Sequence, residues 1–89
     1  MMIYRDGDWL AAKVGNELVM MSATKGNYIG LSEVGARIWE LVETPRTIES
    51  LCDALVAEYD VDPATCRAEV DSFLATLCQH NAVRIDESA

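Results

Sequence analysis

Residues 27–42 read NYIGLSEVGARIWELV, and the spacing of the apolar residues changes in the middle of this stretch. Residues 27–31 alternate in character, which predicts a short strand with Tyr28 and Gly30 on one face. Ser32 follows and is a good N-cap for a helix. The apolar residues after it recur at helical spacing. The stretch therefore predicts a strand that leads directly into a helix.

Two further strands are expected before this junction. Trp9–Val14 and Glu17–Ser22 both have strand patterns, and Gly15-Asn16 between them is a hairpin signal, because both residues tolerate positive φ. The three strands predict an antiparallel meander in which the third strand has one neighbour. Its other edge would carry unpaired N–H and C=O groups.

Three helices and a last short strand complete the expected fold. Pro45 ends the first helix by residue 44. Thr47 caps a second helix, and Asp62-Pro63 opens a third, since Asp accepts free backbone donors and Pro suits the first turn. Asn81 suits the end of that helix, and residues 82–85 predict a fourth strand. The fold class is α+β, a winged helix-turn-helix with an N-terminal three-stranded antiparallel sheet followed by three helices.

Length and composition indicate one globular domain. The 89 residues, of which 51% are hydrophobic, predict a single domain over residues 1–89 with an ordered core of about residues 8–85. No apolar run is long enough for a membrane helix, and the N-terminus turns acidic too early for a secretory signal. The three cysteines form no CxxC pair, so we expect reduced thiols in a cytoplasmic protein.

The net charge of −8 is unevenly distributed. Residues 1–31 carry three acidic and three basic side chains, whereas residues 32–89 carry twelve acidic and four basic ones. Nucleic acids and anionic membranes would be repelled by the second part, and a basic partner attracted. The third helix contains Arg67 as its only basic residue besides His80, with acidic neighbours, so DNA binding is disfavoured.

The sequence offers no recognisable active site, metal site or cofactor site. His80 and Cys78 are two residues apart and would point to different sides of a helix, so they do not form a catalytic pair. Asp60 and Asp62 lack the other ligands of a calcium loop. An enzyme that uses Cys78 or Cys66 as its nucleophile is kept as a hypothesis, but the expectation is a binding domain without catalysis. An extended peptide could add to the free edge of the third strand.

The same residues carry a resemblance to a known family. A tyrosine-bearing strand followed by Leu-x-x-x-Gly-x-x-Ile-Trp-x-Leu, here residues 31–41, resembles the hallmark of PqqD-like proteins. Residues 47–51, 59–62 and 70–74 also fit, and the similarity covers roughly residues 8–85. PqqD-like domains recognise the leader region of ribosomally made, modified precursor peptides, which they hold as an added strand against the third helix.

The resemblance implies where this chain would hold a leader. Main-chain contacts would come from the third strand, and side-chain contacts from one face of the third helix. The implied peptide-binding residues are Lys25, Gly26, Asn27, Tyr28, Ile29, Gly30, Cys66, Arg67, Glu69, Val70, Phe73, Leu74 and Leu77. The helical spacing leaves open which of the helix residues belong to the core; Phe73 and Leu77 are candidates for the core, whereas Cys66 and Val70 are the better groove candidates.

The resemblance also implies partners. The preferred interpretation is the recognition subunit of a lasso-peptide system, which delivers the precursor to a leader peptidase and a cyclase. One alternative is a PqqD-type peptide chaperone for a radical enzyme in pyrroloquinoline quinone biosynthesis. An alternative of another class is an acidic winged-helix transcription regulator. No cofactor, metal, nucleic acid or membrane is expected as a partner.

Overall fold

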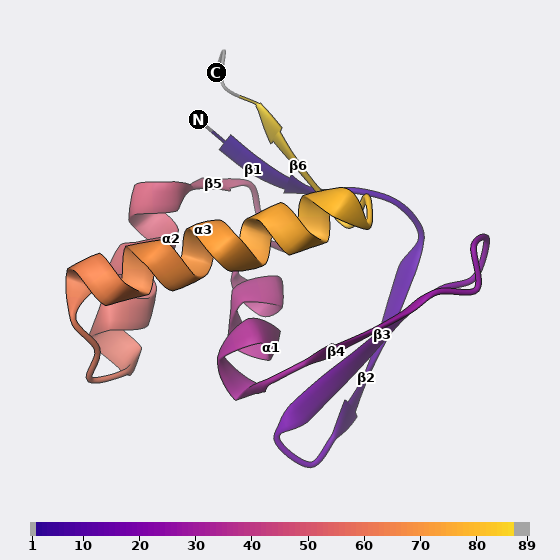
Figure 1. Ribbon diagram of the computed structural model, residues 1–89, viewed down its shortest axis with the longest axis horizontal. Coiled ribbons are helices and arrows are strands. Elements are labelled where there is room, and N and C mark those ends of the chain that lie inside the picture. Colours follow the sequence, from indigo (N-terminus) through magenta and orange to yellow (C-terminus); the bar gives the residue numbers. More distant parts are fainter. Residues whose placement is uncertain (1, 87–89) are drawn as a thin grey trace.

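The computed structural model describes residues 2–86 and contains three helices and six strands within them (Figure 1). The elements in chain order are β1 (Met2–Arg5), β2 (Trp9–Val14), β3 (Glu17–Ser22), β4 (Tyr28–Leu31), α1 (Glu33–Leu41), β5 (Arg46–Thr47), α2 (Ile48–Glu58), α3 (Pro63–Gln79) and β6 (Val83–Asp86). The α+β class is confirmed.

The strands form two antiparallel sheets of three strands each, in the orders β2-β3-β4 and β5-β1-β6. The meander predicted from the sequence is confirmed as the first sheet. The expectation of one N-terminal sheet was incomplete, because β1 and β5 were not predicted. The last strand was expected over residues 82–85; it is β6, Val83–Asp86, and it pairs with β1.

The unpredicted strand β1 contributes to the core. Its Ile3 is fully buried, so the core begins before the range 8–85 that was expected from the sequence. Four residues are too few to show a reliable alternation, and β5 has only two. Within β1, Ile3 belongs to the apolar core cluster, whereas Arg5 is exposed.

The three helices begin where the capping residues predicted. Ser32 accepts a hydrogen bond from the Gly35 amide, Thr47 from the Ser50 amide and Asp62 from the Thr65 amide. Each bond satisfies one of the backbone donors that a helix N-terminus leaves free. The third helix ends at Gln79, and Asn81 adopts a positive φ of 59°, which permits the sharp return into β6.

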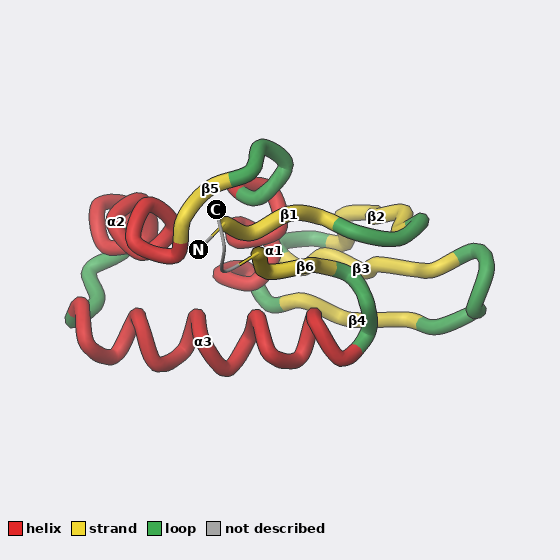
Figure 2. The backbone as a smooth tube through the Cα atoms, turned by 90° about the horizontal axis from the view of Figure 1, so that it is seen from above, coloured by secondary structure: helices red, strands yellow, loops and turns green. Residues whose placement is uncertain are grey.

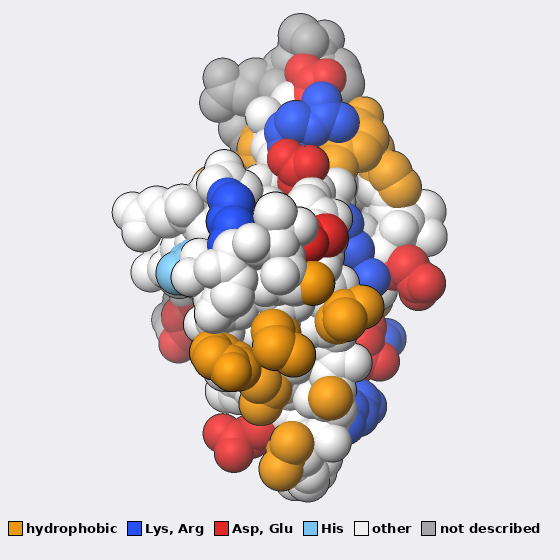
Figure 3. Space-filling model, turned by 90° about the vertical axis from the view of Figure 1, so that its right-hand side faces the viewer, with side chains coloured by type: hydrophobic (Ala, Val, Ile, Leu, Met, Phe, Trp, Pro, Cys, Tyr) orange, Lys and Arg blue, Asp and Glu red, His pale blue; other side chains and the backbone are white. Residues whose placement is uncertain are grey.

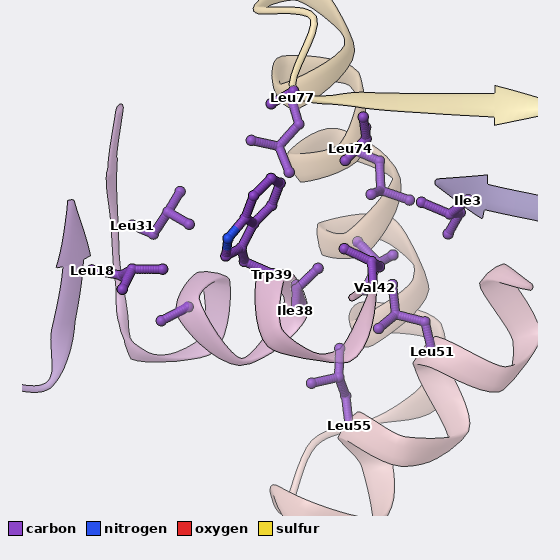
Figure 4. Packing of buried hydrophobic residues seen from close by; sticks show 14 of the residues in the cluster. Ile3, Leu18, Leu31, Ile38, Trp39, Val42, Leu51, Leu55, Leu74 and Leu77 are labelled. Atoms are coloured by element: carbon purple, nitrogen blue, oxygen red, sulfur yellow. The ribbon is translucent and has the colours of Figure 1, made fainter. Parts of the chain in front are cut away.

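A single apolar core joins the helices to both sheets. Trp39 of α1 lies at its centre, and Figure 4 shows the indole pointing toward Leu77 of α3. Ile3 reaches this cluster from the second sheet, and Leu18 and Leu31 reach it from the first (Figure 4). Seen from above, β4 lies on the side of the first sheet nearest α3 (Figure 2). The fold thus leaves one sheet edge and one long helix on the same side of the molecule.

Replacement of the buried Ile3 tests the contribution of β1. Ile3→Ala should lower the free energy of unfolding by about 2–5 kcal/mol, because it removes buried methyl groups and leaves a cavity. Leu10→Ala is the control, since Leu10 is 63% exposed, and it should change stability by about 0.5 kcal/mol or less. Urea denaturation followed by circular dichroism measures both. Equal stability of the Ile3→Ala variant and the unchanged chain would contradict this role of β1.

Candidate functional site

The edge of β4 is available for hydrogen bonding. Among residues 2–86, β4 pairs with β3 and with no other strand. The Ser22 amide donates to the Asn27 carbonyl at 3.0 Å. In an antiparallel ladder every second residue pair is hydrogen-bonded, so this bond identifies which residues of β4 bond to β3. Ile29 and Leu31 then bond to β3, whereas the N–H and C=O groups of Tyr28 and Gly30 point away from it. These two residues offer the main-chain groups that an added strand would need.

The turn before β4 is fixed by Asp8. Its carboxylate accepts hydrogen bonds from the Ser22 hydroxyl and the Thr24 amide, each at 2.9 Å, and from the Thr24 hydroxyl. These bonds, above all those from Thr24 and Ser22, lower the pKa of Asp8 to about 2. The amides of Lys25 and Gly26 donate to Ser22, so their donors serve the turn.

An apolar pocket of about 240 Å³ opens between the start of α1, the α2–α3 connection and α3. Ser32, the residue that directly follows β4, is part of its lining, so the pocket lies next to the end of this strand. Val34 and Val61, 39% and 38% exposed, are two apolar residues of its lining that solvent reaches. The full lining is Ser32, Val34, Gly35, Ile38, Leu55, Tyr59, Val61, Cys66, Glu69, Val70 and Phe73. Such a pocket can accept an apolar side chain.

The Phe73 ring lies directly against Gly35 in the wall of this pocket. A Cβ atom built on Gly35 would lie 3.1 Å from the Phe73 ring, closer than ordinary van der Waals contact. The missing side chain of Gly35 therefore lets α1 and the Phe73 ring approach each other. Phe73 is only partly buried, so its ring forms both part of the pocket wall and part of the surface that packs on the core.

The structure separates the predicted residues of α3 into three groups. Cys66, Glu69, Val70 and Phe73 line the pocket, and of these Cys66 and Val70 are also buried members of the core, whereas Phe73 is only partly buried. Leu74 and Leu77 are at most 1% exposed and belong to the core. Arg67 lies outside the pocket, where its Nε contacts the Asp71 carboxylate at 3.1 Å on an exposed part of the helix.

A family model described as coenzyme PQQ synthesis protein D (PqqD) matches residues 17–83. The chain belongs to the PqqD family. The matched segment includes β4, α1 and α3, and therefore both the free edge and the pocket. The matched segment also contains the strand–helix junction of residues 27–42.

Two solved structures are similar to this PqqD-family chain over most of its length. The first, described as TbiB1 in complex with the TbiA(beta) leader peptide, is 32% identical with a TM-score of 0.82, covering 93% of this chain and 99% of that one. The second, described as lasso peptide synthetase B1 complexed with the leader peptide, is 14% identical with a TM-score of 0.80, covering 93% and 98%. The second likeness establishes the fold alone. No curated protein gives a significant sequence match.

Several pocket residues of this PqqD-family chain were not predicted to be peptide-binding residues. They come from α1, α2 and the α2–α3 connection, and each has an ordinary structural interpretation by itself. They are Ser32, Val34, Gly35, Ile38, Leu55, Tyr59 and Val61. The closest signal was the Gly35 of the helix motif, because a glycine inside a helix costs stability and often marks a close approach.

The thiols have the properties of structural cysteines. All three cysteines are free, and Cys66 is buried. Burial raises the pKa of Cys52 and of Cys78, which disfavours the reactive thiolate. Within residues 2–86 no group of three potential metal-binding side chains lies together. In the same range, no helix has the length and apolar character needed to cross a membrane.

Replacement of Asp8 tests whether it orders the turn that leads into β4. Because folding lowers the pKa of Asp8 to about 2, its ionised form stabilises the fold above its ordinary pKa. This contribution is lost as pH falls through about 2. Asp8→Asn should therefore speed hydrogen exchange at the Thr24 amide at neutral pH.

The corresponding control is Asp60→Asn in the exposed α2–α3 connection, which should leave the Thr24 amide unchanged. Hydrogen exchange followed by NMR measures the effect near pH 7, and the chemical shifts of the turn follow the titration of Asp8. Identical exchange in the Asp8→Asn variant and the unchanged chain would contradict the role of this carboxylate.

Proposed function

We propose that this chain binds the leader segment of a ribosomally made precursor peptide as a strand added to β4, in lasso-peptide biosynthesis. The observation that carries this proposal is the free edge of β4 next to an apolar pocket that begins at Ser32. The 32% identical structure, described as a complex with a leader peptide, supports it.

The two parts of the site would contribute differently to binding. The backbone groups of Tyr28 and Gly30 would bond to the leader main chain, which gives affinity with little dependence on sequence. The pocket between α1 and α3 would take an apolar leader side chain, which gives selectivity. Of the residues implied by the resemblance, Asn27 and Ile29 then hold β4 in its sheet, whereas Leu74 and Leu77 support α3 from the core.

Charge would add to the selectivity. Glu69 lines the pocket, and residues 32–89 carry the whole excess of negative charge. A leader with a basic residue next to its apolar anchor would therefore associate faster, and the effect would weaken at high salt. Arg67 is paired with Asp71 at the surface, where such pairs contribute little to stability, so it would be available to an acidic group of the leader.

The bound precursor would be delivered to separate enzymes, a leader peptidase and a cyclase, in the cytoplasm. Burial raises the pKa of Cys52 and of Cys78, which disfavours either thiol as a catalytic nucleophile. The description of the matching family model favours a second candidate, a chaperone for a radical enzyme in pyrroloquinoline quinone synthesis. The genes next to this one would separate the two pathways.

A winged-helix transcription regulator is disfavoured by the same surfaces. The single arginine of α3, Arg67, contacts Asp71, so this helix presents little positive charge to phosphates. A retarded DNA band at low salt, without binding of any leader, would favour that alternative over the peptide-binding proposal.

Substitution at Gly30 tests strand addition directly. Gly30→Pro removes an N–H that points away from β3, so the β3–β4 ladder should persist while one bond to the leader is lost. We expect at least a 10-fold loss of leader affinity. Gly30→Ala is the matched control, because it keeps the amide and its Cβ would meet no atom within 4 Å. Its affinity should stay within twofold of the unchanged chain.

Both affinities are measured by fluorescence anisotropy with a labelled leader from the precursor encoded near this gene. Circular dichroism confirms that each variant is folded. Unchanged leader binding by folded Gly30→Pro would rule out strand addition at this edge.

Substitution at Gly35 tests the pocket separately. In Gly35→Ala the new Cβ would contact the Phe73 ring, which would shift into the pocket and reduce its volume. Leader affinity should fall about 10-fold or more for leaders with a large apolar anchor, and less for a leader in which that anchor is replaced by alanine. The same titration with both peptides measures the difference. An equal loss for both peptides would mean that the pocket does not hold the anchor.

A further inference from the structure

The first sheet has a second uncovered edge, which is formed by β2. Among residues 2–86, β2 pairs with β3 and with no other strand, and Figure 2 shows β2 and β4 on opposite sides of this sheet. Five of the six residues of β2 are exposed, so the helices do not cover this strand. The pairing runs from Trp9 to Val14 without a bulge, and β2 contains no proline. The edge therefore lacks two of the usual devices that prevent strand addition.

The phase of the sheet determines which main-chain groups face this edge. Because the Ser22 amide donates to β4, Val19 of β3 bonds to β2 instead. Val19 pairs with Ala12, so the main-chain groups of Ala12 point toward β3. Those of its neighbours Ala11 and Lys13 point away from β3. These two residues offer the N–H and C=O groups that an added strand would need.

A polar cavity of about 190 Å³ lies beside this edge, between the β2–β3 hairpin and one face of α1. Lys13 lines it from the inner side of β2, since Lys13 pairs with the buried Leu18. The charged residues that α1 contributes are Glu33, Arg37 and Glu40. Typical small-molecule sites have roughly 300–1,000 Å³, so this cavity suits a single side chain better than a cofactor.

The charges of the cavity favour a basic side chain. The Glu58 carboxylate accepts hydrogen bonds from Nε of Arg37 at 2.7 Å and from its Nη2 at 2.9 Å, which compensates the charge of Arg37. Glu33 and Glu40 lie about two turns apart on the same face of α1. Within residues 2–86 their carboxylates form no hydrogen bond or salt bridge. Lys13 then opposes two carboxylates, and a further cation would complete the balance.

A strand added to β2 would meet different surroundings on its two sides, because side chains alternate between the faces of a strand. On the inner side they would face the cavity and the exposed Ala11. On the outer side they would lie beside Leu10, Ala12 and Val14. In Figure 3, hydrophobic side chains gather in the lower half of the view and charged ones lie along its right-hand margin. The segment that fits has basic residues at alternate positions and apolar residues between them.

We propose that the edge of β2 is a second strand-addition site, which takes an extended segment of a partner protein with basic residues at alternate positions. The site uses another strand and another face of α1 than the leader site, so it does not depend on the proposed function. A second copy of this chain fits less well. It carries the same net charge of −8, and Lys13 is the only basic residue that its β2 would supply.

Substitution at Ala11 tests the main-chain bonds. The probe is a fluorescein-labelled synthetic peptide of alternating lysine and valine, titrated by fluorescence anisotropy at physiological salt. Ala11→Pro removes an N–H that points away from β3, so the β2–β3 ladder should persist while peptide affinity falls at least 10-fold. Ala11→Ser is the matched control, because it keeps the amide, and its affinity should stay within twofold. Both variants should bind the leader as the unchanged chain does.

Substitution of two glutamates tests the cavity. Glu33→Gln combined with Glu40→Gln should weaken binding of the lysine peptide about 10-fold or more, and should leave a peptide of alternating glutamine and valine within twofold. Glu43→Gln combined with Glu49→Gln is the matched control, because it changes the net charge equally at residues outside the cavity. It should alter the affinity for the lysine peptide by less than twofold.

Four results would overturn the inference. The first is equal affinity for the lysine peptide and for one of alternating glutamate and valine, and the second is unchanged binding by folded Ala11→Pro. The third is loss of lysine-peptide binding in Gly30→Pro instead, which would place the peptide at β4. The fourth is a dimer in sedimentation experiments that Ala11→Pro dissociates, which would assign the edge to a second copy.

A pair of modified peptides gives the same test without any change to the protein, in case circular dichroism shows that Ala11→Pro does not fold. One lysine–valine peptide is N-methylated at its lysines and the other at its valines, so each loses the amide donors of one edge. One of the two should bind the unchanged chain at least 10-fold more weakly than the other. Equal affinities would exclude strand addition at β2.

Discussion

The structure depends on the burial of Trp39 between the two sheets. The indole of Trp39 is 5% exposed and lies in the core that α1 shares with α3 and the first sheet. From the second sheet, Arg5 places its guanidinium 4.1 Å from the indole centroid and donates through Nε to the Trp39 carbonyl at 3.2 Å. One residue of α1 thus connects β1 to the meander. The same helix also contributes Val34, Gly35 and Ile38 to one wall of the pocket.

The sequence predicted the parts of the fold that local chemistry determines. The change of period at Ser32 located the end of β4 and the start of α1, and the capping residues Thr47 and Asp62 located the other helices. These signals lie within a few residues of the feature they predict. Strand β1 gave no such signal, because Ile3 is buried by contacts with residues far away in the chain.

The candidate site was predictable to the same extent. The alternation of residues 28–31 predicted that Tyr28 and Gly30 share one face of β4, and the structure shows that this face is exposed while Ile29 and Leu31 are buried. The apolar residues of α3 could not be divided between core and groove in the same way. Phe73 lies at the pocket because α1 approaches it at Gly35, and this approach depends on tertiary packing.

The packing that stabilises β4 also determines what β4 can offer a ligand. Its apolar side chains are used by the core, and half of its main-chain groups are used by β3, so the remaining groups are the backbone of Tyr28 and Gly30. Backbone bonds alone discriminate poorly between sequences. In the proposed mode of binding, this edge would supply affinity and the pocket at Ser32 would supply selectivity, so the two would come from different elements. The pocket could then change with its ligand through substitutions in α1 and α3, without altering the sheet that holds the main chain.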